Sequence, residues 1–136
     1  MRGTVATAVV VGLVGCATAH YDVEPSEIPR PFGDLELNAA GRVQYALLSS
    51  GFDVAGCDIS DVEFVYREKP WLDVRLGLVA GLFDRGERRI YVAVASSEPN
   101  VLEHELIHAY QVCLPVPFRS GHPQELFGPG GVLESL

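Results

Sequence analysis

The chain has 136 residues, of which 48% are hydrophobic and 21% are charged. This composition is typical of a globular protein, and the length is sufficient for one domain with a single core. Acidic residues outnumber basic ones by 18 to 10, which gives a formal net charge of -8. The basic residues form no large cluster, so a nucleic acid is excluded as an expected partner.

The N-terminal segment, residues 1–15, has the features of a signal peptide. Arg2 supplies a positive charge, and the mostly apolar run over residues 5–14 is too short to span a bilayer comfortably. The run leads into Leu13-Val14-Gly15-Cys16, which resembles the lipobox of bacterial lipoproteins. The resemblance implies that Cys16 is lipidated after cleavage, that the lipid bilayer is a partner, and that the protein resides in the bacterial cell envelope.

Ala17 follows the cysteine of this motif. In lipoprotein families an aspartate at that position commonly retains the protein at the inner membrane. Its absence therefore favours the outer membrane, if the organism has two membranes. We expect residues 16–34, which contain Pro25, Pro29 and Pro31, to form the lipidated cysteine and a flexible tether. Residues 35–136 then form the folded domain.

The other two cysteines are Cys57 and Cys113. In an oxidising envelope compartment they form either a disulfide or two separate buried thiols. The sequence gives no distance between them, so both alternatives stay open at this point.

The elements of the domain follow from the apolar periodicity and the turn residues. Residues 35–50 have helical spacing, and residues 62–66 have the composition of a strand. Residues 74–83 and 88–95 alternate around a turn at residues 84–87, which predicts a β-hairpin.

A second helix is expected after the cap residues at 96–100. It runs to about Val112, since Pro115 and Pro117 prevent it from continuing much further. A short helical turn is expected near residues 123–127. Together the elements predict an α+β domain with a small antiparallel sheet, one helix that backs it, and one helix that carries the motif described next.

The second helix contains His104-Glu105-Leu106-Ile107-His108, an H-E-x-x-H motif. Residues four apart lie about 40° apart around a helix, so both imidazoles can reach one metal ion. Glu105 lies about 100° round from His104, beside such an ion, where its carboxylate can take a proton from water. The motif therefore predicts Zn2+ as cofactor, with Glu105 as catalytic base.

The opposite side of this helix is apolar. Leu102, Leu106, Ala109 and Cys113 fall between about 140° and 200° from His104. We therefore expect these residues, Cys113 included, to face the core while the histidines face away from it.

Catalytic zinc usually has three protein ligands, so a third is needed. His122, Glu125 and Glu134 lie downstream. A metzincin would have a glycine and a third histidine where this chain has Gln111 and Leu114, which excludes that subclass. The histidine pair followed by Glu125 resembles the gluzincins over roughly residues 88–127. The resemblance implies a zincin-like fold and Glu125 as third ligand. His122 remains an alternative ligand, or a group that stabilises an oxyanion.

The zincin resemblance also implies how a substrate binds, since an edge strand before the active helix typically pairs with the substrate backbone. The residues in the matching place are Arg89, Ile90, Tyr91, Val92, Ala93 and Val94. The expected function is that of a zinc metallopeptidase that hydrolyses peptides or proteins in the cell envelope. The alternative is a non-catalytic zinc-binding lipoprotein with a binding or assembly role.

Overall fold

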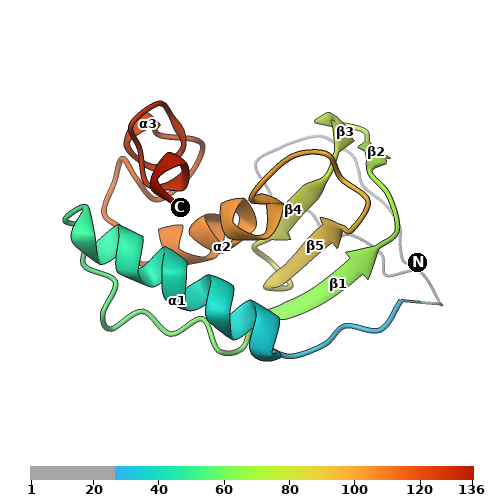
Figure 1. The fold of residues 1–136 in the computed structure, drawn as a ribbon, viewed down its shortest axis with the longest axis horizontal. Coiled ribbons are helices and arrows are strands. Elements are labelled where there is room, and N and C mark those ends of the chain that lie inside the picture. Colours follow the sequence, from blue (N-terminus) through green and yellow to red (C-terminus); the bar gives the residue numbers. More distant parts are fainter. Residues whose placement is uncertain (1–26) are drawn as a thin grey trace.

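The computed structural model describes residues 27–136 (Figure 1). The expected signal segment, Cys16 and the expected tether through residue 26 lie outside the described residues. The fold is α+β, as expected. Its elements in chain order are α1 (Asp34–Ser49), β1 (Glu63–Arg67), β2 (Trp71–Asp73), β3 (Gly77–Val79), β4 (Gly81–Asp84), β5 (Arg89–Ala93), α2 (Val101–Gln111), α3 (Gln124–Phe127) and the 3-10 turn η3 (Leu133–Ser135).

The main sheet has three strands in the order β1-β5-β4. β4 and β5 pair antiparallel as a hairpin, whereas β1 and β5 pair parallel, with Phe64 opposite Ile90. The sheet is therefore mixed, and the prediction of an antiparallel sheet is wrong in this respect. The reason is the long connection between β1 and β4, which carries the chain past the place beside β1. The hairpin turn after β4 then brings β5 back between the two strands, where it runs in the same direction as β1.

Residues 74–83 do not form the single strand that their alternation predicted. Asp73 accepts hydrogen bonds through Oδ1 from the backbone N–H groups of Arg75, at 2.8 Å, and Leu76, at 2.9 Å. This Asx-type turn and the positive φ of Gly77, 81°, reverse the chain. The result is a separate two-stranded hairpin, β2–β3, before β4 begins.

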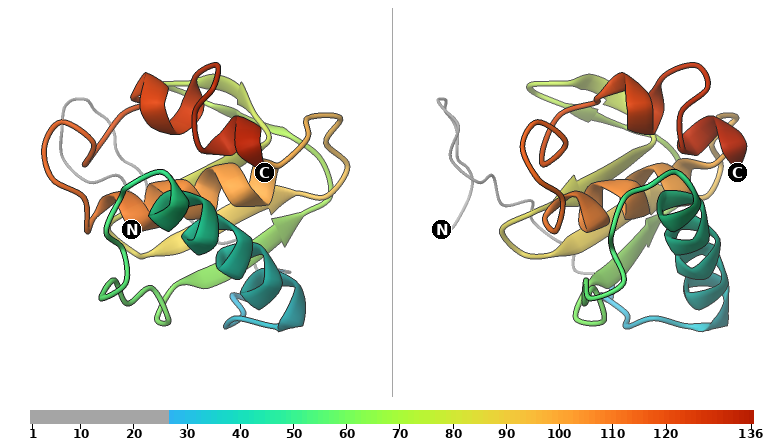
Figure 2. Two further views of the ribbon diagram at one scale, coloured as in Figure 1. Left: turned by 60° about the vertical axis from the view of Figure 1, so that its left-hand side comes forward. Right: turned by 90° about the vertical axis from the view of Figure 1, so that its left-hand side faces the viewer.

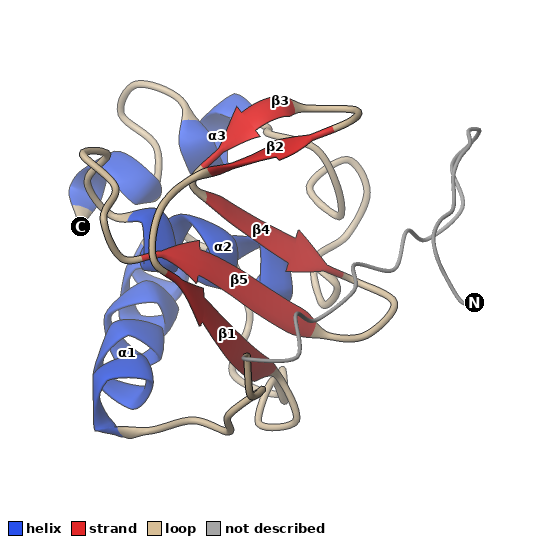
Figure 3. Cartoon of the chain, turned by 90° about the vertical axis from the view of Figure 1, so that its right-hand side faces the viewer, coloured by secondary structure: helices blue, strands red, loops and turns tan. Residues whose placement is uncertain are grey.

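Both long helices pack on one face of the sheet, and Figure 3 shows them behind the strands. The core between them is made of fully buried side chains from α1, the sheet and α2, including Val43, Leu47, Phe64, Ile90 and Leu106. The other face of the sheet carries a smaller cluster of Val65, Leu82 and Tyr91, with Trp71 packed against it. The main core therefore fixes α2 firmly against the strands.

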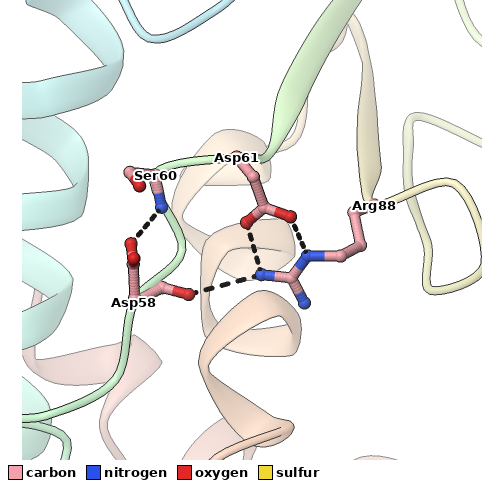
Figure 4. Close-up of polar contacts among 4 residues, drawn as sticks. All are labelled: Asp58, Ser60, Asp61 and Arg88. Atoms are coloured by element: carbon pink, nitrogen blue, oxygen red, sulfur yellow. Dashed lines mark hydrogen bonds and ion pairs between the residues drawn. The ribbon is translucent and has the colours of Figure 1, made fainter.

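Two links hold the loop between α1 and β1. A disulfide joins Cys57 to Cys113 just beyond the end of α2, and such cross-links typically contribute about 2–4 kcal/mol. The Arg88 guanidinium donates to both carboxylate oxygens of Asp61, at 2.7 and 2.9 Å (Figure 4). This pair lowers the pKa of Asp61.

The expectation that Cys113 faces the core is wrong. α2 ends at Gln111, so the helical position extrapolated to residue 113 does not apply, and Cys113 is exposed in the turn that follows.

The end of the expected tether is part of the fold. Backbone N–H and C=O groups of Arg30 and Phe64 exchange hydrogen bonds of 2.9 and 2.8 Å, and the Phe32 ring packs edge-on against Phe64. The boundary expected at residue 34 is therefore too late. Among residues 27–136, no helix has both the length and the hydropathy that crossing a bilayer requires.

Candidate metal centre

Helix α2 presents its histidines away from the core, as its apolar periodicity predicted. Leu106, Ile107 and Ala109 are fully buried against the sheet and α1. His104 and His108 are half-buried on the other side. Figure 2 shows α3 and the adjoining C-terminal loops over this side of α2.

The third member of the cluster is His122, in the loop before α3. Its Nε2 lies 3.3 Å from Nε2 of His104 and 3.2 Å from Nε2 of His108. Ligand atoms of all three histidines lie within 4.8 Å of one another. Nitrogens bound to one tetrahedral zinc at about 2.0–2.1 Å are roughly 3.3–3.4 Å apart. The three side chains therefore fit a divalent ion that prefers imidazole ligands.

Glu125 does not belong to this cluster. It lies in the first turn of α3 and is exposed, while its neighbour Leu126 is fully buried and fixes which side of the turn faces the core. His122, the alternative ligand, takes the place in the cluster that the gluzincin resemblance assigned to Glu125, so among the described residues the candidate ligand set is His104, His108 and His122. The convergence of its Nε2 with those of His104 and His108 favours a ligand role for His122 over an oxyanion role.

The remaining downstream carboxylate, Glu134, has a structural contact instead. It accepts a hydrogen bond from the backbone N–H of Gly130 at 2.7 Å, which closes the C-terminal turn.

Gln111 orients His108, a role that the sequence reasoning missed. Its Nε2 donates to the backbone carbonyls of Phe118, at 2.9 Å, and Gly121, at 3.1 Å. This fixes the amide so that Oε1, 2.6 Å from Nδ1 of His108, accepts the proton on Nδ1. Nε2 of His108 is then left with its lone pair toward the cluster. The i, i+3 spacing from His108 was the available signal.

Phe127 of α3 was also missed. Its ring centroid lies 4.7, 4.6 and 4.8 Å from the rings of His104, His108 and His122. The aromatic ring therefore covers the cluster on the α3 side and limits the access of water from there.

Burial keeps the two helical histidines neutral. It lowers the pKa of His104 to about 4, with the charge of His122 as a second cause. Burial likewise lowers the pKa of His108 to about 4. A metal ligand must be the neutral imidazole, so both side chains are in the required form at neutral pH.

Glu105 lies on the inner side of the helix and is only 6% exposed. Burial raises the pKa of its carboxyl to about 8. The carboxylate lies against Gly81 at the start of β4, where a Cβ atom would come within 2.9 Å of Oε2 and 2.6 Å of Cγ1 of Val101. Glycine at position 81 therefore permits the close approach of α2 to the strand.

The strand expected to pair with a substrate is misassigned. Residues Arg89–Ala93 form β5, which is central and is paired on both sides by β1 and β4. The edge strand beside α2 is β4, and within residues 27–136 no strand pairs with its outer side. Since Ala93 N–H donates to the Ala80 carbonyl, Gly81 and Phe83 direct their backbone groups outward.

Comparisons with known proteins gave no match to a family model, to a curated protein or to a solved structure.

Proposed function

We propose that this chain is a zincin-like zinc metallopeptidase of the bacterial cell envelope, held at a membrane by a lipid on Cys16. The observation that carries the proposal is the convergence of three imidazole side chains, two of which flank Glu105 in the sequence of α2. Glu105 is buried against Gly81 of β4, whose outer edge no strand pairs with in the described residues. Binding, general base catalysis and substrate alignment would each have a group in place.

His104, His108 and His122 would hold the ion. When bound there, zinc would lower the pKa of water toward about 7 and polarise a substrate carbonyl. Gln111 would keep the His108 ring in the tautomer that binds, and Phe127 would shield the ligands from bulk water.

Glu105 would accept a proton from the attacking water and deliver it to the leaving amine. Burial raises the pKa of its carboxyl to about 8 in the metal-free protein, so the group is mostly protonated at neutral pH. A bound cation would lower this pKa and give the carboxylate that acts as base. The contact with Gly81 holds it at the start of β4, close to where a chain paired with that strand would lie.

A peptide in extended form could pair with the outward backbone groups of Gly81 and Phe83. This mode needs no particular side chain, so it suits an unfolded or extended protein substrate. The set of three histidines differs from the gluzincin pattern, which has a glutamate as third ligand. We therefore propose a zincin-like enzyme and do not assign it to the gluzincins.

The test is the hydrolysis of a fluorescent unfolded protein, such as labelled casein, by the wild type and by Glu105→Ala. We expect the substitution to lower the rate at least about 100-fold, with the zinc content unchanged. Glu125→Ala is the matched control, because it removes an exposed carboxylate of α3, and it should leave the hydrolysis rate and the zinc content unchanged. Zinc binding with a rate that does not respond to Glu105→Ala would favour the non-catalytic alternative instead.

A further inference from the structure

The β2–β3 hairpin exposes large aliphatic side chains. Leu72, Val74, Leu76 and Leu78 are 80%, 95%, 60% and 71% exposed. Leu72 and Leu78 are directly opposite each other in the register, so they share one face, and Val74 and Leu76 lie in the connecting turn. An apolar cluster of this kind at the tip of a projecting element is a mark of an interaction surface.

The hairpin is held in place at both ends. The buried Asp73 closes its turn through the two backbone hydrogen bonds described above. At its base, the Trp71 ring packs edge-on against Tyr91 with centroids 6.4 Å apart. The aliphatic side chains are therefore displayed by an ordered element, and Figure 3 shows it beyond β4, on the side of the sheet away from β1.

The N-terminal segment reaches the body of the protein at this base. Glu27, the first described residue, accepts a hydrogen bond of 2.8 Å from Nε of Arg67, whose guanidinium lies 4.7 Å from the Trp71 ring centroid. From Cys16 to Glu27 there are 27 − 16 = 11 residue steps, which span at most about 40 Å. A lipid on Cys16 would therefore hold the base of the hairpin within about 40 Å of the bilayer.

We propose that the tip of the β2–β3 hairpin inserts into the boundary between head groups and acyl chains of the bilayer, as a second membrane contact. The hairpin contains Asp73 and Arg75, and Glu68 and Lys69 precede it, a net 2 − 2 = 0 in a chain with net charge -8. An anionic membrane surface therefore repels this segment less than it repels the rest of the acidic chain. Aliphatic side chains flanked by cations are the composition of interfacial elements.

A second copy of the chain is a poorer occupant, since a stable interface buries about 800 Å² on each partner and a hairpin tip with four apolar side chains offers less. The inference rests on the anchoring part of the proposed function and is independent of zinc and of Glu105.

The experiment places a tryptophan reporter at the tip. Trp71 is the single tryptophan of the chain, so Trp71→Phe gives a silent background that keeps an aromatic ring at the base. Val74→Trp reports from the tip, and Leu37→Trp, on an exposed position of α1, is the matched control. The full anchored chains are reconstituted into vesicles of phosphatidylethanolamine and phosphatidylglycerol, with or without brominated acyl chains, and circular dichroism checks that each is folded.

We expect brominated lipid to quench Val74→Trp at least about twofold more than Leu37→Trp. Adding Leu72→Asp and Leu78→Asp to the tip reporter should remove the difference. Equal quenching at the two positions, or none, would overturn the inference, as would chains that do not float with the vesicles.

An emission shift that needs only a higher protein concentration would assign the tip to a second copy. A shift that needs added casein would assign it to a substrate, and either result would overturn membrane insertion. Zinc content and casein hydrolysis, measured on the same samples, report separately whether the proposed enzyme has failed.

Discussion

The cluster around α2 and the β2–β3 hairpin depart in opposite directions from the usual distribution of side chains. Around α2, a glutamate is buried and histidines are kept neutral against an aromatic ring. In the hairpin, leucines and a valine project into the surroundings. Burying a carboxyl and exposing aliphatic groups both cost free energy.

This contrast indicates what kind of partner each region binds. Buried polar groups that converge on a point suit a small, charged ligand, and here their geometry matches a metal ion. Exposed apolar groups at a tip suit an extended apolar phase. β4 connects the two, because it follows the hairpin directly in the chain and begins at the contact with Glu105.

We expect the largest effect from Gly81→Ala, which would disturb the contact between β4 and Glu105 of α2. The added Cβ would lie 2.6 Å from Cγ1 of Val101 and 2.9 Å from Oε2 of Glu105, so α2 must shift from the strand. We expect a loss of about 1–3 kcal/mol in the free energy of unfolding, measured by urea denaturation, and slower casein hydrolysis. Gly41→Ala is the control, since no atom lies within 4 Å of its Cβ position, and it should not destabilise the protein. Equal stability of the two variants would contradict the tight contact.

Gln111→Ala tests whether the polar groups around the cluster act on the metal. Without the amide, nothing fixes the tautomer of His108, and we expect zinc affinity to fall about 10–100-fold in competition titrations with a chromophoric chelator. Gln124→Ala, which removes an exposed amide at the start of α3, should leave the affinity unchanged. An unchanged affinity in Gln111→Ala would show that the hydrogen bond serves the fold alone.

The smallest effect concerns the pH dependence of the metal-free protein. The folded pKa of Glu105 is raised from 4.5 to about 8, so the folded state binds more protons than the unfolded state between these values, and this group destabilises the fold as pH rises through that range. Glu105→Gln should therefore gain stability over the wild type at pH 8, by about 1 kcal/mol or more, and gain little at pH 4.5. Thermal unfolding in the presence of a chelator measures both.

The lowered pKa values of His104 and His108 act in the opposite direction. They destabilise the fold as pH falls from 6.5 toward about 4. Because both variants retain these histidines, that contribution cancels in the difference. A gain that is the same at both pH values would contradict the buried carboxyl.

Local patterns were enough to predict part of the site. The four-residue spacing of His104 and His108 determines that they share one face of a helix, and the apolar residues between them determine which face is buried. The hairpin formed by β4 and β5 followed equally from alternation and a turn. These features depend on residues close together in the chain.

The third ligand and the edge strand depend on distant contacts. His122 reaches the cluster because Gly121, with a positive φ of 70°, turns the loop. The side-chain amide of Gln111 holds the Gly121 carbonyl by a hydrogen bond. Neither effect is visible in the spacing, so a familiar pattern favoured Glu125. Likewise, the pairing of β1 with β5 made β5 central, and no local signal in residues 89–93 reports a partner so far away in sequence.

The most direct test of the account is the zinc content of three purified proteins, the wild type, His122→Ala and Glu125→Ala, after dialysis against metal-free buffer. We expect one zinc ion per chain in the wild type and in Glu125→Ala, and a loss of most of the zinc in His122→Ala. Zinc that is kept by His122→Ala and lost by Glu125→Ala would contradict the three-histidine centre.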